Sequence, residues 1–251
     1  MDWFFFALRI FKRPYKGRYK SWQKALSKST GYNDEPIISQ SIRSFYEVSN
    51  GWAKFERDSL LFYQYEIDPW VEFVKKDLHA DLKVLDFGGG MATAYFKNRP
   101  VFIEYPNLKW YIIEQKVYVK YIEVPSHVNF IKFIYDTEPV KHEKFDLLIL
   151  GCVLPYLEKP YEVFEQLIKL DFKYLIIDKH PLKLGSNDRL TIQTVNPKIY
   201  PATYPAWFFS SKKFKKFLKY HNLTVIHKYE NPDFTNVGIG FFTFIIKKNE
   251  S

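Results

Sequence analysis

Five short apolar segments alternate with helical segments between residues 82 and 180, and this alternation constrains the fold more than any other feature of the chain. Each segment is apolar almost throughout, so both of its faces are expected to be buried. Buried strands separated by helices form a parallel sheet with helices on each side. The predicted strands are Lys83–Phe87, Lys109–Glu114, Val128–Phe133, Phe145–Leu150 and Tyr174–Asp178.

The last part of the chain has a different pattern. A helix is predicted from Ser210 or Ser211 to about Tyr220. Two strands follow, Leu223–Tyr229 and Phe241–Lys247, and no helix lies between them, so they are expected to pair antiparallel. The sequence therefore predicts an α/β fold with a mostly parallel, seven-stranded sheet that ends in an antiparallel strand.

Residues 1–80 show no strand alternation. Ser39–Tyr46 and Gly51–Tyr65 carry apolar residues at three- and four-residue spacing, which is typical of helices, and Asp68-Pro69 starts another helix. We therefore expect an N-terminal helical extension over 1–80 and a main domain over 81–251, with an insertion at about 181–209.

The first residues include an apolar run, Trp3–Leu8, that is too short to cross a bilayer and lacks the features of a secretory signal. It is expected either to pack on the domain or to rest on a membrane surface as an amphipathic helix. A single cysteine, Cys152, excludes an internal disulfide and a cysteine-rich zinc site, and we predict no metal. This cysteine usage fits a cytoplasmic protein, either free or at the inner face of the membrane.

The net charge of +9 favours anionic partners, which include phosphorylated metabolites, nucleic acid and anionic membranes. The lysines and arginines are scattered, with their densest clusters at residues 12–20 and 212–216. No aromatic RNA-binding string accompanies them, so a solvated basic surface is favoured over a nucleic-acid groove.

Three glycines, Gly88, Gly89 and Gly90, follow the first predicted strand. Ligands of an open parallel sheet bind at the carboxyl ends of its strands, and glycines there let the backbone approach a ligand closely. The third glycine of a dinucleotide fingerprint is missing, because Thr93 stands in its place, and no GK[ST] sequence completes a P-loop. A purely structural turn is the alternative.

Two acids stand beside this turn. Asp86 ends the first strand, where it can accept hydrogen bonds from turn amides or bind a ligand ammonium group. Glu114 ends the second strand, near the distance at which an acid binds ribose hydroxyls. Together the acids and the turn indicate a nucleoside ligand rather than a dinucleotide; a glycine cap with two solvated acids is the alternative.

The segments Val84–Gly90 (VLDFGGG), Ile112–Glu114 (IIE) and Phe145–Leu157 (FDLLILGCVLPYL) resemble motifs of the class I S-adenosylmethionine-dependent methyltransferases. The resemblance covers residues 82–248 and implies a Rossmann-like fold with strand order 3-2-1-4-5-7-6. It also implies S-adenosyl-L-methionine as cofactor and S-adenosyl-L-homocysteine as product. The cofactor-binding residues would be Asp86, Gly88, Gly89, Gly90, Glu114, Asp136, Gly151, Cys152 and Val153.

These residues would have different roles. Asp86 would lie near the cofactor ammonium group, Glu114 would hold the ribose, and Asp136 would lie near the adenine. Gly151–Val153 would line the methionine end. For Asp136 a polar loop is an equal alternative, and from its apolar surroundings Cys152 is interpreted as a small core residue rather than a nucleophile.

A narrower resemblance extends over most of the chain. The phrases SWQKALSKSTGY (21–32), FERDS (55–59), LDFGGG (85–90), DRLTIQ (188–193) and YPAWFFS (204–210) resemble a poorly characterised group of methyltransferase-like proteins of bacterial surface-polysaccharide and capsule biosynthesis. This resemblance implies a glycan-precursor substrate. The implied activity is O-methyl transfer to an anionic, carbohydrate-linked or phosphoryl-type acceptor.

The methyl acceptor, if it is a hydroxyl, needs a base. His180 follows the fifth strand and is the best candidate, with Asp178 to orient it; a loop histidine without a partner is an equal alternative. The insertion is expected to cover the acceptor site with Arg189, Gln193, Tyr204 and Trp207, or else to be a structural cap. Arg57-Asp58 would close the cofactor pocket or form a surface ion pair.

Three other functions remain open. One is an RNA or small-molecule methyltransferase on the same fold, although GCVLPY replaces the NPPY-type sequence expected for base methylation. Another is a non-catalytic binding module, against which the intact Asp86, glycine turn and Glu114 argue. A nicotinamide-dependent oxidoreductase is disfavoured by the missing third glycine.

Overall fold

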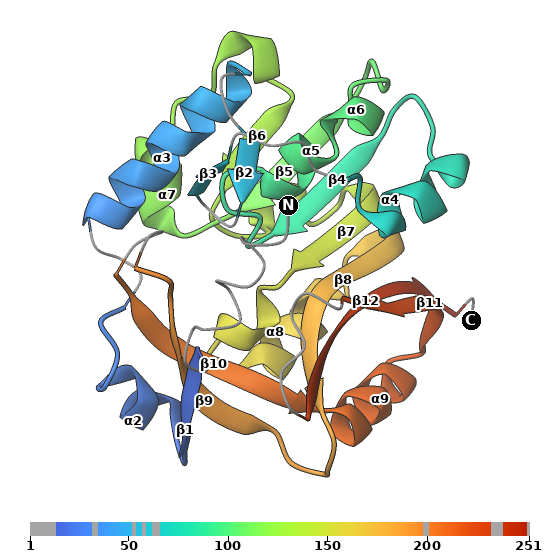
Figure 1. The fold of residues 1–251 in the computed structure, drawn as a ribbon. Coiled ribbons are helices and arrows are strands. Elements are labelled where there is room, and N and C mark those ends of the chain that lie inside the picture. Colours follow the sequence, from blue (N-terminus) through green and yellow to red (C-terminus); the bar gives the residue numbers. More distant parts are fainter. Residues whose placement is uncertain are drawn as a thin grey trace, which may run out of the picture.

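A mixed sheet runs through the molecule, and helices cover both of its faces (Figure 1). The structure is a computed structural model that describes residues 14–31, 35–51, 54–56, 59–61, 66–197, 201–231 and 238–249. Its strands are β1 Tyr15–Tyr19, β2 Lys54–Glu56, β3 Ser59–Leu61, β4 Lys83–Phe87, β5 Lys109–Ile113, β6 Ile131–Ile134, β7 Lys144–Gly151, β8 Asp171–Lys183, β9 Arg189–Thr194, β10 Thr203–Ser210, β11 Leu223–Glu230 and β12 Ile239–Lys248. Its helices are α2 Trp22–Leu26, α3 Glu35–Ser49, α4 Pro69–Val74, α5 Thr93–Lys97, α6 Arg99–Phe102, α7 Lys116–Tyr121, α8 Pro160–Leu167 and α9 Ser211–Tyr220.

Seven strands form the central part of the sheet in the order β6-β5-β4-β7-β8-β12-β11. The first five are parallel to one another, β12 runs antiparallel to β8, and β11 runs antiparallel to β12. This is the predicted order 3-2-1-4-5-7-6 with its antiparallel end, so the prediction of the sheet is confirmed. Ser210 and Ser211 were the two predicted caps of the helix α9. Ser210 is the cap, because its side chain accepts a hydrogen bond from the Lys213 amide at 3.1 Å.

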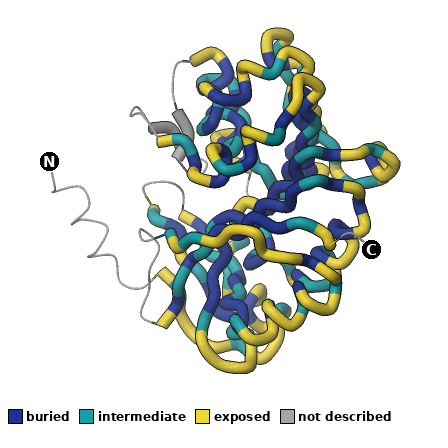
Figure 2. Tube along the Cα trace, turned by 90° about the vertical axis from the view of Figure 1, so that its right-hand side faces the viewer, coloured by how far each residue is buried: buried dark blue, intermediate teal, exposed yellow. Residues whose placement is uncertain are grey.

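Both faces of the parallel strands are buried, as the sequence predicted. Along β7, Leu147 and Ile149 belong to one apolar cluster, whereas Leu148 and Leu150 belong to another. The first cluster packs against α3–α6 and the second against α8 and α9. Figure 2 shows the buried stretches gathered along the central strands, with exposed residues on the turns and the outer sides of the helices.

Three further strands extend the sheet beyond the seven that were predicted. The far end of β8 pairs with β10, which pairs with β9, and β9 pairs with β1. The segment 181–209 is therefore largely β-structure that continues the sheet, with β1 from the N-terminal region at its edge (Figure 1).

The N-terminal region, predicted as a helical extension, also contains strands. Tyr15–Tyr19 forms β1, and within the segment Gly51–Tyr65, which was predicted as a helix, β2 pairs antiparallel with β3, Phe55 opposite Leu60. Three of the five residues of β1 are exposed, Gly17 among them, because an edge strand is held by its backbone hydrogen bonds and needs no apolar face. Helices α2, α3 and α4 do lie in this region. The segment 1–11 and Arg57-Asp58 lie outside the described residues.

None of the helices that the structure describes is both long enough and apolar enough to span a bilayer.

A buried polar cluster joins α4 to α5. Asn98 is completely buried: its side-chain oxygen accepts from the Asp68 amide at 2.8 Å, and its side-chain nitrogen donates to the Asp68 carboxylate and to the Ala94 carbonyl, each at 2.9 Å. Lys97 forms an ion pair with the same carboxylate. Because buried polar groups must be paired, this cluster fixes the N-terminus of α4 against α5.

We expect Asn98→Ala to lower the free energy of unfolding by about 2–4 kcal/mol, since it leaves the buried Asp68 amide without a partner and removes one of the two partners of the Asp68 carboxylate. Urea unfolding measures this loss. The control is Asn107→Ala, which removes one bond between the exposed Asn107 and Asp81 and should cost less than about 1 kcal/mol. Equal losses in the two variants would contradict a stabilising role for the buried cluster.

Candidate cofactor and acceptor site

The predicted cofactor residues meet at the carboxyl edge of the parallel strands. The glycine turn follows β4, Glu114 follows β5, Gly151–Val153 follows β7, and Asp178 lies on β8 beside Gly151. Figure 1 shows these strand ends pointing toward the part of the sheet formed by β9, β10 and β1. This is the edge at which an open α/β sheet binds its ligands.

Glu114 holds the glycine turn against β5. Its Oε1 accepts a hydrogen bond from the Gly90 amide at 3.1 Å, and its Oε2 accepts one from the Gln115 amide at 2.8 Å. The Gly88 amide donates to the Ile113 carbonyl at 2.9 Å. Glu114 is half-buried.

The turn needs glycine at two positions for steric reasons. Gly88 has φ +66°, and a Cβ atom there would lie 2.3 Å from Val153 Cγ2. A Cβ atom on Gly89 would lie 2.4 Å from Asp86 Cγ. Val153 and Asp86 therefore pack directly against the turn backbone.

Asp86 is buried beneath the turn without full hydrogen bonding. Its side chain is 1% exposed, its Oδ2 accepts a long hydrogen bond of 3.4 Å from Trp110 Nε1, and its Oδ1 has no partner among the described residues. Burial raises its pKa to about 7; the Trp110 hydrogen bond opposes this effect and the Glu114 carboxylate adds to it. Buried polar atoms are normally hydrogen-bonded, so the unpaired Oδ1 of Asp86 is unusual.

Unusual backbone conformations gather at the same edge. Ala92 after β4, Cys152 after β7 and Lys179 in β8 have φ values of 61°, 53° and 52°. Asn222, in the α9–β11 turn, is the fourth described non-glycine residue with positive φ. Such conformations cost of order 1–3 kcal/mol each and concentrate at functional sites. Cys152 thus lies half-buried in a turn, and its interpretation as a core residue is wrong.

Asp178 sits in a polar cluster between β8 and β12. Thr243 donates its hydroxyl to Asp178 Oδ1, and Lys179 Nζ lies 3.0 Å from Asp178 Oδ2. Burial alone would raise the pKa of Asp178. The Lys179 ammonium and the Thr243 hydroxyl have the larger, opposite effect, so the pKa lies below its ordinary value and the carboxyl stays ionised. Burial lowers the pKa of Lys179, whereas Asp178 and Asp68 raise it above its ordinary value.

His180 does not face this cluster, which corrects its prediction as the base. Its ring is 1% exposed and lies 4.4 Å from the ring centroids of both Phe209 and Phe214, in the apolar cluster under α9. Burial lowers its pKa to about 3, so it is neutral at physiological pH. Asp178 interacts electrostatically with Lys97 of α5, on the other face of the sheet, and so cannot orient His180.

The predicted acceptor residues divide into two groups. Gln193 and Tyr204 pair across β9 and β10, and both contact Tyr156: the Tyr156 hydroxyl donates to Gln193 Oε1 at 2.8 Å, and the Tyr156 and Tyr204 rings meet edge to face at 5.1 Å. Tyr156 Oη also lies 4.0 Å from Cys152 Sγ. Gln193 and Tyr204 therefore stand beside the carboxyl end of β7.

Trp207 and Arg189 have other surroundings. Trp207 stacks on Trp22 of α2 at 6.4 Å and donates to the Leu157 carbonyl at 3.1 Å. The Arg189 guanidinium lies over the Phe208 ring at 4.9 Å, and its buried Nε has no hydrogen-bond partner among the described residues. Trp207 therefore packs against α2 and the segment after β7.

Asp136 caps the turn after β6, where its Oδ1 accepts a hydrogen bond from the Glu138 amide at 3.0 Å. The sequence assigned no role to Tyr156, Lys179 or Thr243, although all three contact the site. Tyr156 lies within the quoted motif after β7, and Lys179 adjoins a predicted residue, so both carried a positional signal. Thr243 carried none, because its proximity depends on the β12–β8 pairing.

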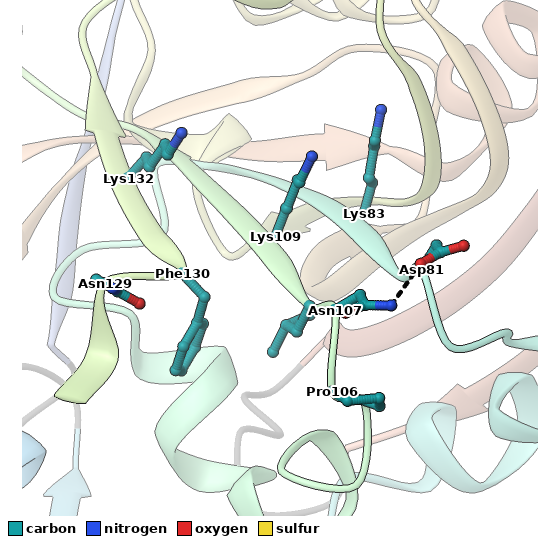
Figure 3. Close-up of a pocket in the computed structure, with 9 residues that line it drawn as sticks. Asp81, Lys83, Pro106, Asn107, Lys109, Asn129, Phe130 and Lys132 are labelled. Carbon is teal, nitrogen blue, oxygen red and sulfur yellow. Dashed lines mark hydrogen bonds between the residues drawn. The ribbon is translucent and has the colours of Figure 1, made fainter. Parts of the chain in front are cut away.

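A groove of about 650 Å³ lies at the opposite, amino-terminal edge of the same strands. Figure 3 shows Lys83, Lys109 and Lys132 side by side on β4, β5 and β6, with Phe130 and Pro106 below them. Lys83 forms an ion pair with Glu143. This groove is separated from the glycine turn by the length of the strands and is not part of the candidate site.

No protein-family model and no curated protein sequence matches the chain. Solved structures do match it. With the [4+2]-cyclase SpnF the TM-score is 0.51 at 10% identity, over 85% of this chain and 94% of that one. With the glycopeptide N-methyltransferase MtfA the TM-score is 0.51 at 10% identity, over 75% of this chain and 92% of that one. With the N-terminal domain of EvdMO1, crystallised in the presence of SAH and D-fucose, the TM-score is 0.50 at 10% identity, over 87% of this chain and 99% of that one.

These likenesses show the fold. Together with the strand order, they confirm the Rossmann-like methyltransferase fold predicted from the sequence. One of the three proteins is named as a cyclase, so the shared fold alone does not determine the reaction.

Two glycine substitutions test the packing of the turn. Gly88→Ala should lower the free energy of unfolding by roughly 1–3 kcal/mol, because it combines positive φ with a clash against Val153. Gly151→Ala should change stability by less than about 0.5 kcal/mol, since no atom lies within 4 Å of the added methyl group and φ is not positive. Thermal and urea unfolding measure both; a neutral Gly88→Ala would show that the turn is not tightly packed.

The buried carboxyl makes a pH-dependent prediction. The folded chain binds the Asp86 proton more tightly than the unfolded chain does, so this group lowers stability progressively as pH rises from about 4 through 7. Asp86→Asn removes the effect, and its stability relative to the wild type should therefore rise by roughly 2–4 kcal/mol between about pH 4 and pH 8. Urea unfolding of both proteins across this pH range measures the trend, and a constant difference between them would contradict it.

Proposed function

We propose that the chain is a methyltransferase that uses S-adenosyl-L-methionine. The observation that carries the proposal is Asp86, a buried carboxyl with an unpaired oxygen directly beneath a glycine turn that Glu114 holds in place. Burying this group destabilises the fold, and a ligand amine bound to it would offset that loss. An amine site on one side of the turn and a second carboxylate on the other fit an aminoacyl group joined to a ribose.

The residues present fit this cofactor. Asp86 would bind its ammonium group, the Gly88–Gly90 backbone would lie along its carboxypropyl part, and Glu114 would accept the ribose hydroxyls. Asp136 would lie near the adenine, and Gly151–Val153 would line the sulfonium end. When bound, the cofactor supplies an activated methyl group. The two proteins of similar fold named as MtfA and EvdMO1 support this choice, one as a methyltransferase and one through its SAH.

The acceptor in this proposal is an oxygen on an anionic, carbohydrate-linked or phosphoryl-type molecule of surface-polysaccharide or capsule biosynthesis. The net charge of +9 supports an anionic acceptor. Gln193, Tyr204 and Tyr156 supply aromatic rings and hydrogen-bonding groups beside the end of β7, which suits a sugar. The phrases DRLTIQ and YPAWFFS, which carry the narrower resemblance, form β9 and β10 at this place.

Catalysis would depend mainly on alignment. Methyl transfer from a sulfonium is an in-line displacement, so holding the acceptor oxygen in line with the methyl group supplies much of the acceleration. His180 is removed as the base by its burial on the other face. Asp178 is ionised, and its two oxygens are occupied by Thr243 and Lys179. In this proposal it holds these two side chains in place and does not act as a strong base.

The division of the chain belongs to the same proposal. Residues 81–251 would carry the cofactor site, and residues 1–80 would complete it from outside the central sheet. β1 already supports β9, which carries Gln193, by pairing Tyr15 with Gln193. A cytoplasmic location, as the single cysteine indicates, fits a cofactor made in the cytoplasm.

Calorimetric titration with S-adenosylmethionine, S-adenosylhomocysteine and NADH tests the cofactor. Micromolar binding of the first two and none of NADH is expected. Glu114→Ala should weaken binding roughly ten- to hundredfold, since it removes a charged hydrogen-bonding group. The matched control is Glu162→Gln on α8, an exposed partner of Lys159, which should leave binding unchanged.

Gly151→Ala separates binding from folding. It is expected to leave stability unchanged and still weaken binding of both nucleosides, because its methyl group enters the space assigned to the sulfonium end. Binding of neither nucleoside by the folded wild type would overturn the cofactor. Binding without methyl transfer to any surface-glycan precursor would leave the cofactor in place and overturn the acceptor class.

A further inference from the structure

Helix α9 presents a row of lysines to solvent. At 100° per residue, Phe214, Phe217 and Leu218 share one side of the helix and pack into the apolar cluster beneath it. The opposite side carries Lys212, Lys215, Lys216 and Lys219, all exposed, with Tyr220 next to Lys216. A ten-residue helix thus presents four ammonium groups on a single face.

Few acids neutralise this face. The sequence of α9, SKKFKKFLKY, contains no acid. Its remaining lysine, Lys213, lies outside this face and pairs with Asp188 at 2.6 Å. Lys228 on the neighbouring β11 extends the positive charge: burial lowers its pKa, and the Lys215 ammonium lowers it further, while Glu230 opposes them. Four exposed lysines of α9 therefore lie on one face of a helix that contains no acid.

An exposed aliphatic side chain lies at one end of the helix. Leu184, in the turn between β8 and β9, is 83% exposed, and Tyr220 at the other end is 80% exposed. The turn is fixed to the start of α9 because Ser210 Oγ donates to the Gly185 carbonyl at 2.6 Å. Lys183 Nζ donates to the Leu184 and Asn187 carbonyls, at 2.7 and 3.0 Å, which keeps the turn in shape. Figure 1 shows α9 next to this turn at the lower right.

We propose that this lysine face, made of Leu184, Lys212, Lys215, Lys216, Lys219 and Tyr220, docks the protein on an anionic lipid bilayer. Lysines attract anionic headgroups, and an aliphatic and an aromatic side chain beside them enter the interfacial layer. A nucleic acid would use the lysines but leave Leu184 in water. The charge and the exposed leucine together therefore favour a bilayer. The proposal is independent of the cofactor and of the N-terminal segment.

The test is co-sedimentation of the full chain with phosphatidylcholine vesicles, with and without phosphatidylglycerol. Binding to the anionic vesicles, weakened by salt, is expected. Changing Lys212, Lys215, Lys216 and Lys219 to Gln together should raise the lipid concentration for half-binding roughly tenfold or more. Leu184→Ser should weaken binding by a smaller factor that salt does not change.

The matched control changes four exposed lysines elsewhere, Lys109, Lys116, Lys120 and Lys132, to Gln. It lowers the net charge equally, so equal loss of binding in both variants would mean attraction by total charge and would overturn the proposal. Binding that survives in the α9 variant but disappears when residues 1–11 are deleted would also overturn it. Failure of the wild type to bind the anionic vesicles would overturn the proposal. So would an α9 variant that binds vesicles as the wild type does but no longer binds polyuridylate.

Discussion

Burial of the parallel strands on both faces is the constraint on which the other features depend. Since β4, β7 and β8 have apolar side chains above and below, polar groups are displaced to the strand ends, where the glycine turn, Glu114 and Cys152 are found. Asp86 and Asp178 are exceptions, because both are buried within strands, β4 and β8. Asp178 is paired with Lys179 and Thr243, whereas the carboxyl of Asp86 lies in the apolar layer, where burial raises its pKa. A group that destabilises the fold in this way is most simply explained by a ligand.

The backbone at the same edge supports this explanation. Cys152 and Lys179, both with positive φ, are adjacent: the Cys152 amide donates to the Asp178 carbonyl at 2.9 Å. The surrounding pairing of β7, β8 and β12 holds these conformations in place. Unfavourable backbone geometry and an unpaired buried carboxyl therefore coincide at one edge of the sheet, whereas the groove at the amino-terminal edge shows neither.

The sequence predicted what local pattern determines and missed what distant pairing determines. The seven central strands and the cap at Ser210 follow from apolar runs and turn residues. β1 has no such pattern, because its place depends on β9, more than 170 residues away in the chain. The site followed the same rule: Glu114 and the glycines meet because parallel strands end together, but Thr243 reaches Asp178 only through β12.

The error at His180 has a specific physical cause. Strict alternation along a strand places residues 178 and 180 on one face, which is why Asp178 was expected to orient the imidazole. The positive φ at Lys179 and the register shift between Phe242 and Phe244 interrupt that alternation, so the two side chains point to opposite faces. β8 then continues to Lys183 and the turn that carries Leu184. At about 3.3 Å per residue, this places the candidate site roughly 20 Å from the lysine face along one strand.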